Sequence, residues 1–217
     1  MSSPKLRESL EEIKSNISAI INGLVNSNEL VYEAIKDCKK EKFTEARAEI
    51  KNIGAKADEI DNSIIRALAL YSPEARDLRT LVAYLKMTNE LSRATSSTRS
   101  FIRGFSAICD DIDTQTLNEF IVPMQKSTLK AVKNTASMID IDDEDEIKDV
   151  YNEVLIQESK TDDLYEMVER SLTKKLDDFE KTHNILKALR KSGKIASRSI
   201  GIANLFVYAK VGGSLHN

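Results

Sequence analysis

The sequence contains few of the residues that interrupt helices or build irregular structure. Its 217 residues include only 7 glycines, 3 prolines and no tryptophan, whereas 31% of them are charged. Glycine and proline weaken or end helices, and charged side chains cover the solvent-facing side of amphipathic helices. The composition therefore predicts long helices joined by short loops. A chain of this length can bury a core as one domain or as two small repeats.

Cysteines and long apolar runs are also scarce. Cys38 and Cys109 belong to no paired motif, so we expect two reduced thiols. No apolar run approaches the roughly 20 residues that span a bilayer, and the first residues, MSSPKLRESLEE, are too polar for a signal peptide. A net charge of -3 supplies no general attraction to nucleic acid or to an anionic membrane. We expect a cytoplasmic protein that meets a membrane only through its partners and binds no nucleic acid.

Signatures of catalysis are missing as well. The sequence has no glycine-rich phosphate loop and no cysteine–histidine nucleophile pair. Glu180 and His183 match half of a di-iron helix motif, but a complete site needs a second copy, and the other histidine, His216, lies in the C-terminal tail. We therefore expect no enzymatic activity, and a surface position for His183.

Apolar residues recur every three or four positions along six segments, the spacing of amphipathic helices. The segments are about residues 5–38, 43–67, 73–109, 114–139, 147–179 and 182–211. In the third segment the seam turns polar halfway along, at Thr88, Ser92 and Thr95. Pro123 is expected to kink the fourth helix, and Thr182 is expected to cap the sixth, which Gly212 and Gly213 end.

Acidic residues precede the fifth segment in the run DIDDEDE, residues 140–146. This run is not a calcium loop, because its sixth position is Asp145 instead of glycine and the twelfth is Tyr151 instead of glutamate. We expect these acids to cap the helix that follows.

Short connections make consecutive helices antiparallel, which indicates an all-α fold of six long antiparallel helices. The six helices divide into two sets of three. Shifting one half by 101 positions places Asp61 on Asp162 and Ser96 on Ser197. The expected organisation is two three-helix-bundle repeats, residues 1–110 and 111–217, packed as one compact unit.

The most distinctive stretch is residues 68–91, LALYSPEARDLRTLVAYLKMTNEL, which joins the second and third helices. We expect Ser72 to be the N-cap of the third helix and Pro73 to stand in its first turn. Asp77 then lies near the positive end of the helix dipole, and Arg79 is expected to brace the helical hairpin.

This stretch resembles the PhoU family of bacterial phosphate-uptake regulators. The residues that carry the resemblance are Ser72, Pro73, Ala75, Asp77, Leu78 and Arg79, followed by Asn89, Glu90 and Leu91. The resemblance implies two three-helix repeats, a homodimer, and a role in phosphate homeostasis and signal transduction. It implies contacts with the ATPase of a phosphate transporter and with a sensor histidine kinase. The alternative is a helical adaptor of a phosphate permease that is not ATP-driven, or of an unrelated partner.

The resemblance also implies metal-binding carboxylate pairs, four residues apart on facing helices. Here the family pattern falls on Ser92 and Ser96 in the third helix and on Gly193 and Ser197 in the sixth, neither of which supplies a carboxylate.

Glu158 and Asp162 on the fifth helix are the pair that remains. We therefore expect no cofactor. Iron, manganese or zinc on this one pair is the alternative to an ion pair of these carboxylates with Lys194 or Arg198, the interpretation we favour, because a buried carboxylate needs neutralisation.

Two rows of basic residues complete the candidates. Arg79, Lys86 and Arg93 are spaced by seven residues on the third helix, where they form either a solvated face or a docking surface for an acidic partner. A second row on the sixth helix contains Lys187, Lys191, Lys194 and Arg198.

Overall fold

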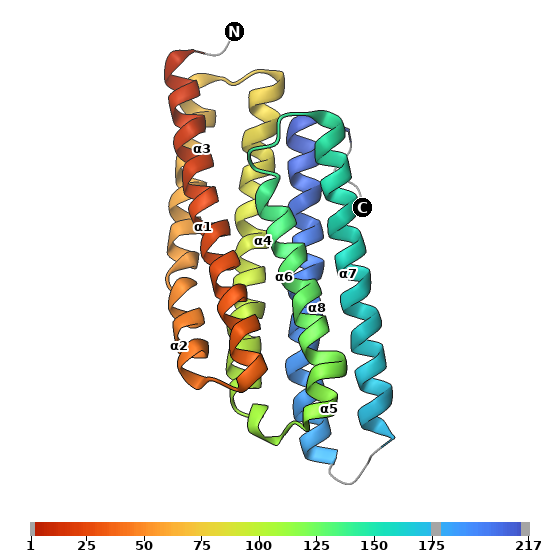
Figure 1. Ribbon diagram of the computed structural model, residues 1–217. Coiled ribbons are helices and arrows are strands. Elements are labelled where there is room, and N and C mark those ends of the chain that lie inside the picture. Colours follow the sequence, from red (N-terminus) through yellow and green to blue (C-terminus); the bar gives the residue numbers. More distant parts are fainter. Residues whose placement is uncertain (1–2, 175–178, 214–217) are drawn as a thin grey trace.

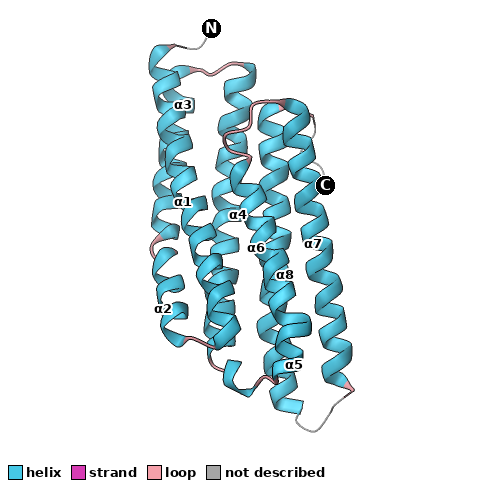
Figure 2. Cartoon of the chain, viewed as in Figure 1, coloured by secondary structure: helices cyan, strands magenta, loops and turns pink. Residues whose placement is uncertain are grey.

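The computed structural model describes residues 3–174 and 179–213. Within these residues the chain forms an elongated bundle of helices without a strand (Figures 1 and 2). The long elements are α1 (Pro4–Asp37), α2 (Lys40–Glu49), α3 (Ile53–Tyr71), α4 (Ala75–Ser106), α6 (Val122–Ser137), α7 (Glu144–Thr173) and α8 (Phe179–Lys210). The predicted all-α class and the antiparallel six-helix bundle are confirmed, with α2 and α3 together in place of one helix. The boundary between repeats 1–110 and 111–217 stays a prediction.

The second predicted helix is interrupted between α2 and α3. Asn52 adopts a left-handed conformation with φ 64°, which asparagine tolerates better than most residues. Ile50 and Ile53 on either side of the break are both buried, so the apolar stripe continues across it. The spacing of apolar residues alone therefore did not reveal the break.

The connection between α3 and α4 differs from the prediction. Ser72 ends α3 in a left-handed conformation, whereas Glu74 is the extended N-cap residue of α4, which begins at Ala75. Pro73 thus stands between the helices instead of in the first turn of α4. The ring of Pro73 disfavours a right-handed helical conformation at Ser72, and this places Ser72 at the end of one helix rather than at the start of the next.

Pro123 disturbs the fourth predicted helix just before its own position. A short turn, α5 (Thr114–Thr116), leads into a π-helical segment, η2 (Leu117–Ile121), and α6 follows with Pro123 in its first turn. Proline supplies no amide hydrogen for the regular ladder, and the irregularity takes the form of a π-turn.

The last two helices show one expected cap and one different start. The Asp143 side chain accepts hydrogen bonds from the amides of Asp145 and Glu146 at the start of α7. Thr182 is buried inside α8, which already runs from Phe179, so the prediction that Thr182 caps this helix is wrong. Gly212 and Gly213, both with positive φ, follow the end of α8 as expected.

The two halves of the chain meet mainly through α4 and α8, which pack along their lengths, and through α1 and α6. α1 and α4 both run towards the lower end of the bundle in Figure 1. There Cys38 caps the end of α1, and a short 3-10 helix, η1 (Cys109–Asp111), follows α4. The Cα atoms of Cys38 and Cys109 are 5.7 Å apart, and the two side chains form a disulfide. The expectation of two reduced thiols is therefore corrected. The antiparallel path of the intervening helices brings together residues that are far apart in sequence.

None of the helices in the described part of the chain combines the length and the apolar character that a bilayer span requires.

Candidate functional site between α4 and α8

The basic row on α4 does not form one uniform face. Arg79 donates a hydrogen bond from Nε to the carbonyl oxygen of Ala209, 3.3 Å away, and thereby holds α4 against the end of α8 rather than against α3. Arg93 lies 3.9 Å from the Glu90 carboxylate. Lys86 is exposed beside the same carboxylate. Two of the three candidate docking residues thus have partners within the chain.

Glu90 forms the central ion pair of this interface. Its Oε2 lies 3.0 Å from Nη1 of Arg198 on α8, and both side chains are partly shielded from solvent. The absence of a side chain at Gly201 leaves room for the carboxylate, since a Cβ there would lie 3.3 Å from Glu90 Oε2. The ion pair borders a polar groove of about 340 Å³ that also contains Lys86 and Asn89.

The remaining residues of the signature stretch lie at the other end of this interface. Leu78 is 42% exposed, Asp77 is half-buried in the first turn of α4, and Ser72 is exposed in the connection before it. The signature therefore combines connection residues with the α4 positions that contact α8.

Glu158 and Asp162 lie on α7, half-buried and exposed respectively. Within residues 3–174 and 179–213, no ion pair joins either carboxylate to Lys194 or Arg198. Arg198 is engaged with Glu90 instead. Burial, together with the charge of Asp162, raises the pKa of Glu158, and burial also raises the pKa of Asp162. A carboxylate pair of this kind can accept a proton or a cation.

Other positions of the family metal pattern lie in this region and at the corresponding place in the first half. Gly193 supplies no ligand atom, and a Cβ there would lie 3.3 Å from Asp162 Oδ1. At the corresponding place in the first half, Asp61 Oδ1 accepts a hydrogen bond of 2.6 Å from Thr88. Among the described residues, the one group of three donor side chains close enough for a metal contains Cys38, Cys109 and Asp110, and its two sulfurs are bonded to each other.

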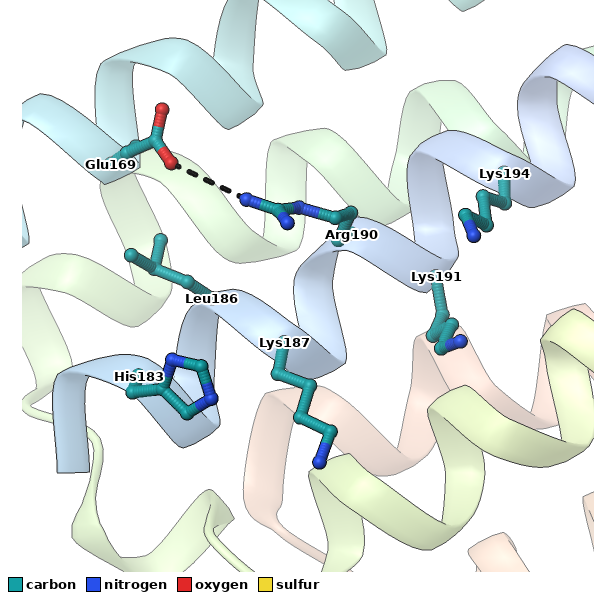
Figure 3. Close-up of a pocket in the computed structure, with 7 residues that line it drawn as sticks. All are labelled: Glu169, His183, Leu186, Lys187, Arg190, Lys191 and Lys194. Carbon is teal, nitrogen blue, oxygen red and sulfur yellow. Dashed lines mark ion pairs between the residues drawn. The ribbon is translucent and has the colours of Figure 1, made fainter. Parts of the chain in front are cut away.

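A second groove follows the N-terminal half of α8. It has a volume of about 410 Å³ and is lined by Glu169, His183, Leu186, Lys187, Arg190, Lys191 and Lys194 (Figure 3). Arg190 extends towards Glu169 at 3.7 Å and donates a hydrogen bond to the Tyr165 hydroxyl. Lys187 and Lys191 extend from α8 away from Glu169 (Figure 3). His183 is exposed, as expected, and stacks on Phe179; His216 lies outside the described residues.

A buried polar network crosses the core where α1, α6, α7 and α8 meet, and the sequence reasoning missed it. Ser192 donates to Gln125 Oε1 at 2.7 Å, and the hydroxyls of Ser192 and Thr128 are 2.9 Å apart. Gln125 in turn reaches Asn28 at 3.5 Å. Polar residues on an otherwise apolar seam indicate such a network in a sequence, and the prediction included them only for α4.

The comparisons with known proteins agree with this architecture. The model of the PhoU domain matches residues 17–100, which include the signature stretch and Glu90. This part of the chain is a PhoU domain.

Solved structures extend the likeness of the fold beyond the PhoU domain. PhoU from Pseudomonas aeruginosa is 21% identical with a TM-score of 0.74, over 96% of this chain and 97% of its own. The phosphate transport system regulatory protein PhoU from Streptococcus pneumoniae is 14% identical with a TM-score of 0.78, over 98% and 99%. A putative PhoU-like phosphate regulatory protein from Shewanella oneidensis is 14% identical with a TM-score of 0.68, over 89% and 96%. A search among curated protein sequences found no match.

Proposed function

We propose that this protein regulates phosphate uptake and phosphate-starvation signalling through protein–protein contacts in the cytoplasm. The observation that carries the proposal is the PhoU domain over residues 17–100, within a chain that shares its fold with a phosphate transport system regulatory protein over nearly its full length. The proposed partners are the ATPase of a phosphate transporter and a sensor histidine kinase. Long rigid helices offer broad surfaces for such contacts and need no catalytic group.

The test is a strain of the source organism that lacks the protein, examined with a reporter of phosphate-starvation genes and by uptake of radiolabelled phosphate. Loss of a regulator should leave the reporter active in phosphate-rich medium, and the wild-type gene should restore repression. An unchanged reporter together with unchanged uptake would contradict the proposal. Altered uptake through a permease that is not ATP-driven, with an unchanged reporter, would favour the alternative adaptor role.

Direct binding tests the partners individually. The purified chain is titrated against the isolated transporter ATPase and against the cytoplasmic part of the kinase, and its mass in solution is measured by light scattering. We expect a complex with at least one of the two proteins and a homodimer of the free chain.

A further inference from the structure

The N-terminal half of α8 carries a row of basic side chains. His183, Lys187, Lys191 and Lys194 follow one another at intervals of four, four and three residues, which places them on one side of the helix over about 16 Å at 1.5 Å per residue. Arg103 on α4 faces Lys187 and Lys191 across a neighbouring groove of about 370 Å³. Two helices thus supply one basic surface, which we define as His183, Lys187, Lys191, Lys194 and Arg103.

The cations of this surface are not used by the fold. In the part of the chain that the structure describes, no ion pair or side-chain hydrogen bond engages Lys187, Lys191, Lys194 or Arg103. Arg190 and Arg198 on the same helix differ, because they pair with Glu169 and Glu90. Unpaired cations gathered in a chain of net charge -3 remain available to an outside anion.

The groove between α4 and α8, which lies between these cations, is narrow and lined partly by small residues. A Cβ at Gly104 would lie 3.3 Å from the Cβ of Ala188, so α4 and α8 approach closely here. Ala107 borders the same groove, and Leu186 is half-buried in the adjoining one. The surface therefore offers apolar contact between its charges, which suits a polypeptide with aliphatic stems better than a hydrated small ion.

We propose that this basic surface binds an acidic helical segment of a partner protein. A helix with carboxylates every three or four residues presents them at the spacing of the lysines, so several charge pairs form at once. A single phosphate ion is too small to contact all the cations of a row about 16 Å long.

This inference rests on the proposed function only for the idea that the protein works by protein contact, and its test is independent of phosphate regulation. The probe is a synthetic helical peptide whose glutamates repeat at intervals of four, four and three residues, with leucines between them. A second peptide of identical composition has its glutamates distributed around the helix. Binding to the full chain is measured by fluorescence anisotropy at low and high salt.

We expect the spaced peptide to bind more tightly than the scrambled one, and high salt to weaken its binding. Reversal of charge in the variant Lys187→Glu/Lys191→Glu should weaken binding by about tenfold or more. The matched control Lys126→Glu/Lys130→Glu, an exposed pair with the same spacing on α6, changes net charge equally and should keep binding within about twofold. Circular dichroism confirms that both variants are folded.

Three outcomes would overturn the proposal: equal affinity for both peptides, equal loss in both variants, or full competition by inorganic phosphate or by duplex DNA at lower concentration than the peptide. The reporter strain separates this proposal from the proposed function. If the chain binds the spaced peptide but its deletion leaves the reporter unchanged, the basic surface is supported and the phosphate role is contradicted. If deletion changes the reporter but the spaced peptide does not bind, only the basic surface is contradicted.

Discussion

At the scale of single residues, the buried hydroxyl groups of the core differ in whether they have a hydrogen-bond partner. Thr95 is 3% exposed, and its Oγ1 is the one buried side-chain nitrogen or oxygen in the described residues that lacks a hydrogen-bond partner. The Thr128 hydroxyl, in contrast, has two hydrogen-bond partners, the Ser192 hydroxyl and the Met124 carbonyl oxygen. A buried polar group without a partner costs free energy, and a paired one does not.

We expect Thr95→Val to raise the free energy of unfolding by about 1 kcal/mol, because it removes the unpaired hydroxyl with little change in shape. Thr128→Val, the matched control, should lower it by about 1–3 kcal/mol, because Ser192 then loses a partner. Urea denaturation followed by circular dichroism measures both. A destabilised Thr95→Val variant would show that its hydroxyl has a partner in solution.

Glu158 supplies a prediction about pH. The folded protein raises the pKa of this carboxyl above its ordinary value of 4.5, chiefly through burial. The folded state therefore binds the proton more tightly than the unfolded state, and the ionised carboxylate lowers stability at every pH above the raised pKa. This loss fades as the pH falls through the raised pKa towards the ordinary value.

Glu158→Gln should therefore raise the melting temperature at pH 7, and the gain should vanish below about pH 4. Glu153→Gln, an exposed position on the same helix, is the control and should change little. A bound metal predicts the reverse, namely a lower melting temperature in Glu158→Gln and loss of iron, manganese or zinc in elemental analysis of protein purified without chelator.

At the scale of the elements, close approaches of helix backbones select glycine. A Cβ at Gly23 on α1 would lie 2.9 Å from the backbone oxygen of Glu49, at the end of α2. A Cβ at Gly54 on α3 meets nothing within 4 Å. The two glycines are both helical, so they separate the effect of packing from that of intrinsic helix propensity.

Gly23→Ala is expected to destabilise the protein by about 1–3 kcal/mol, because the backbone of α2 has to move. Gly54→Ala should instead stabilise it by about 0.5–1 kcal/mol through better helix propensity. Thermal melts of the two variants provide the measurement. A neutral Gly23→Ala would mean that α1 and α2 are farther apart than the structure shows.

At the scale of the whole molecule, the disulfide joins the lower ends of α1 and α4 across 71 residues of chain. A cross-link that closes a long loop stabilises mainly by limiting the unfolded state. Replacement of both Cys38 and Cys109 by serine should lower the free energy of unfolding by about 2–5 kcal/mol under oxidising conditions.

Denaturation with and without a dithiol reductant tests this expectation. The reductant should lower the free energy of unfolding of the wild-type protein to nearly that of the double variant. It should leave the free energy of unfolding of the variant unchanged. Two free thiols per chain, titrated in unfolded protein prepared without reductant, would contradict the disulfide.

The sequence by itself determined the features that depend on local chemistry. The spacing of apolar residues determined six helical segments, without the break between α2 and α3. The acidic run 140–146 and the pair Gly212 and Gly213 marked a start and an end, and the signature from Ser72 to Glu90 indicated the PhoU domain. These features follow from backbone propensity and from burial on one face of each helix, both of which act over a few neighbouring residues.

Only the tertiary structure decided which distant groups meet. Arg198 pairs with Glu90 instead of Glu158, and Cys38 bonds to Cys109. Such choices depend on how each helix is rotated and shifted against its neighbours, which the apolar spacing of one helix does not specify. For the same reason, the sequence indicated the basic row on α8 but not that Arg103 of α4 lies across a groove from Lys187.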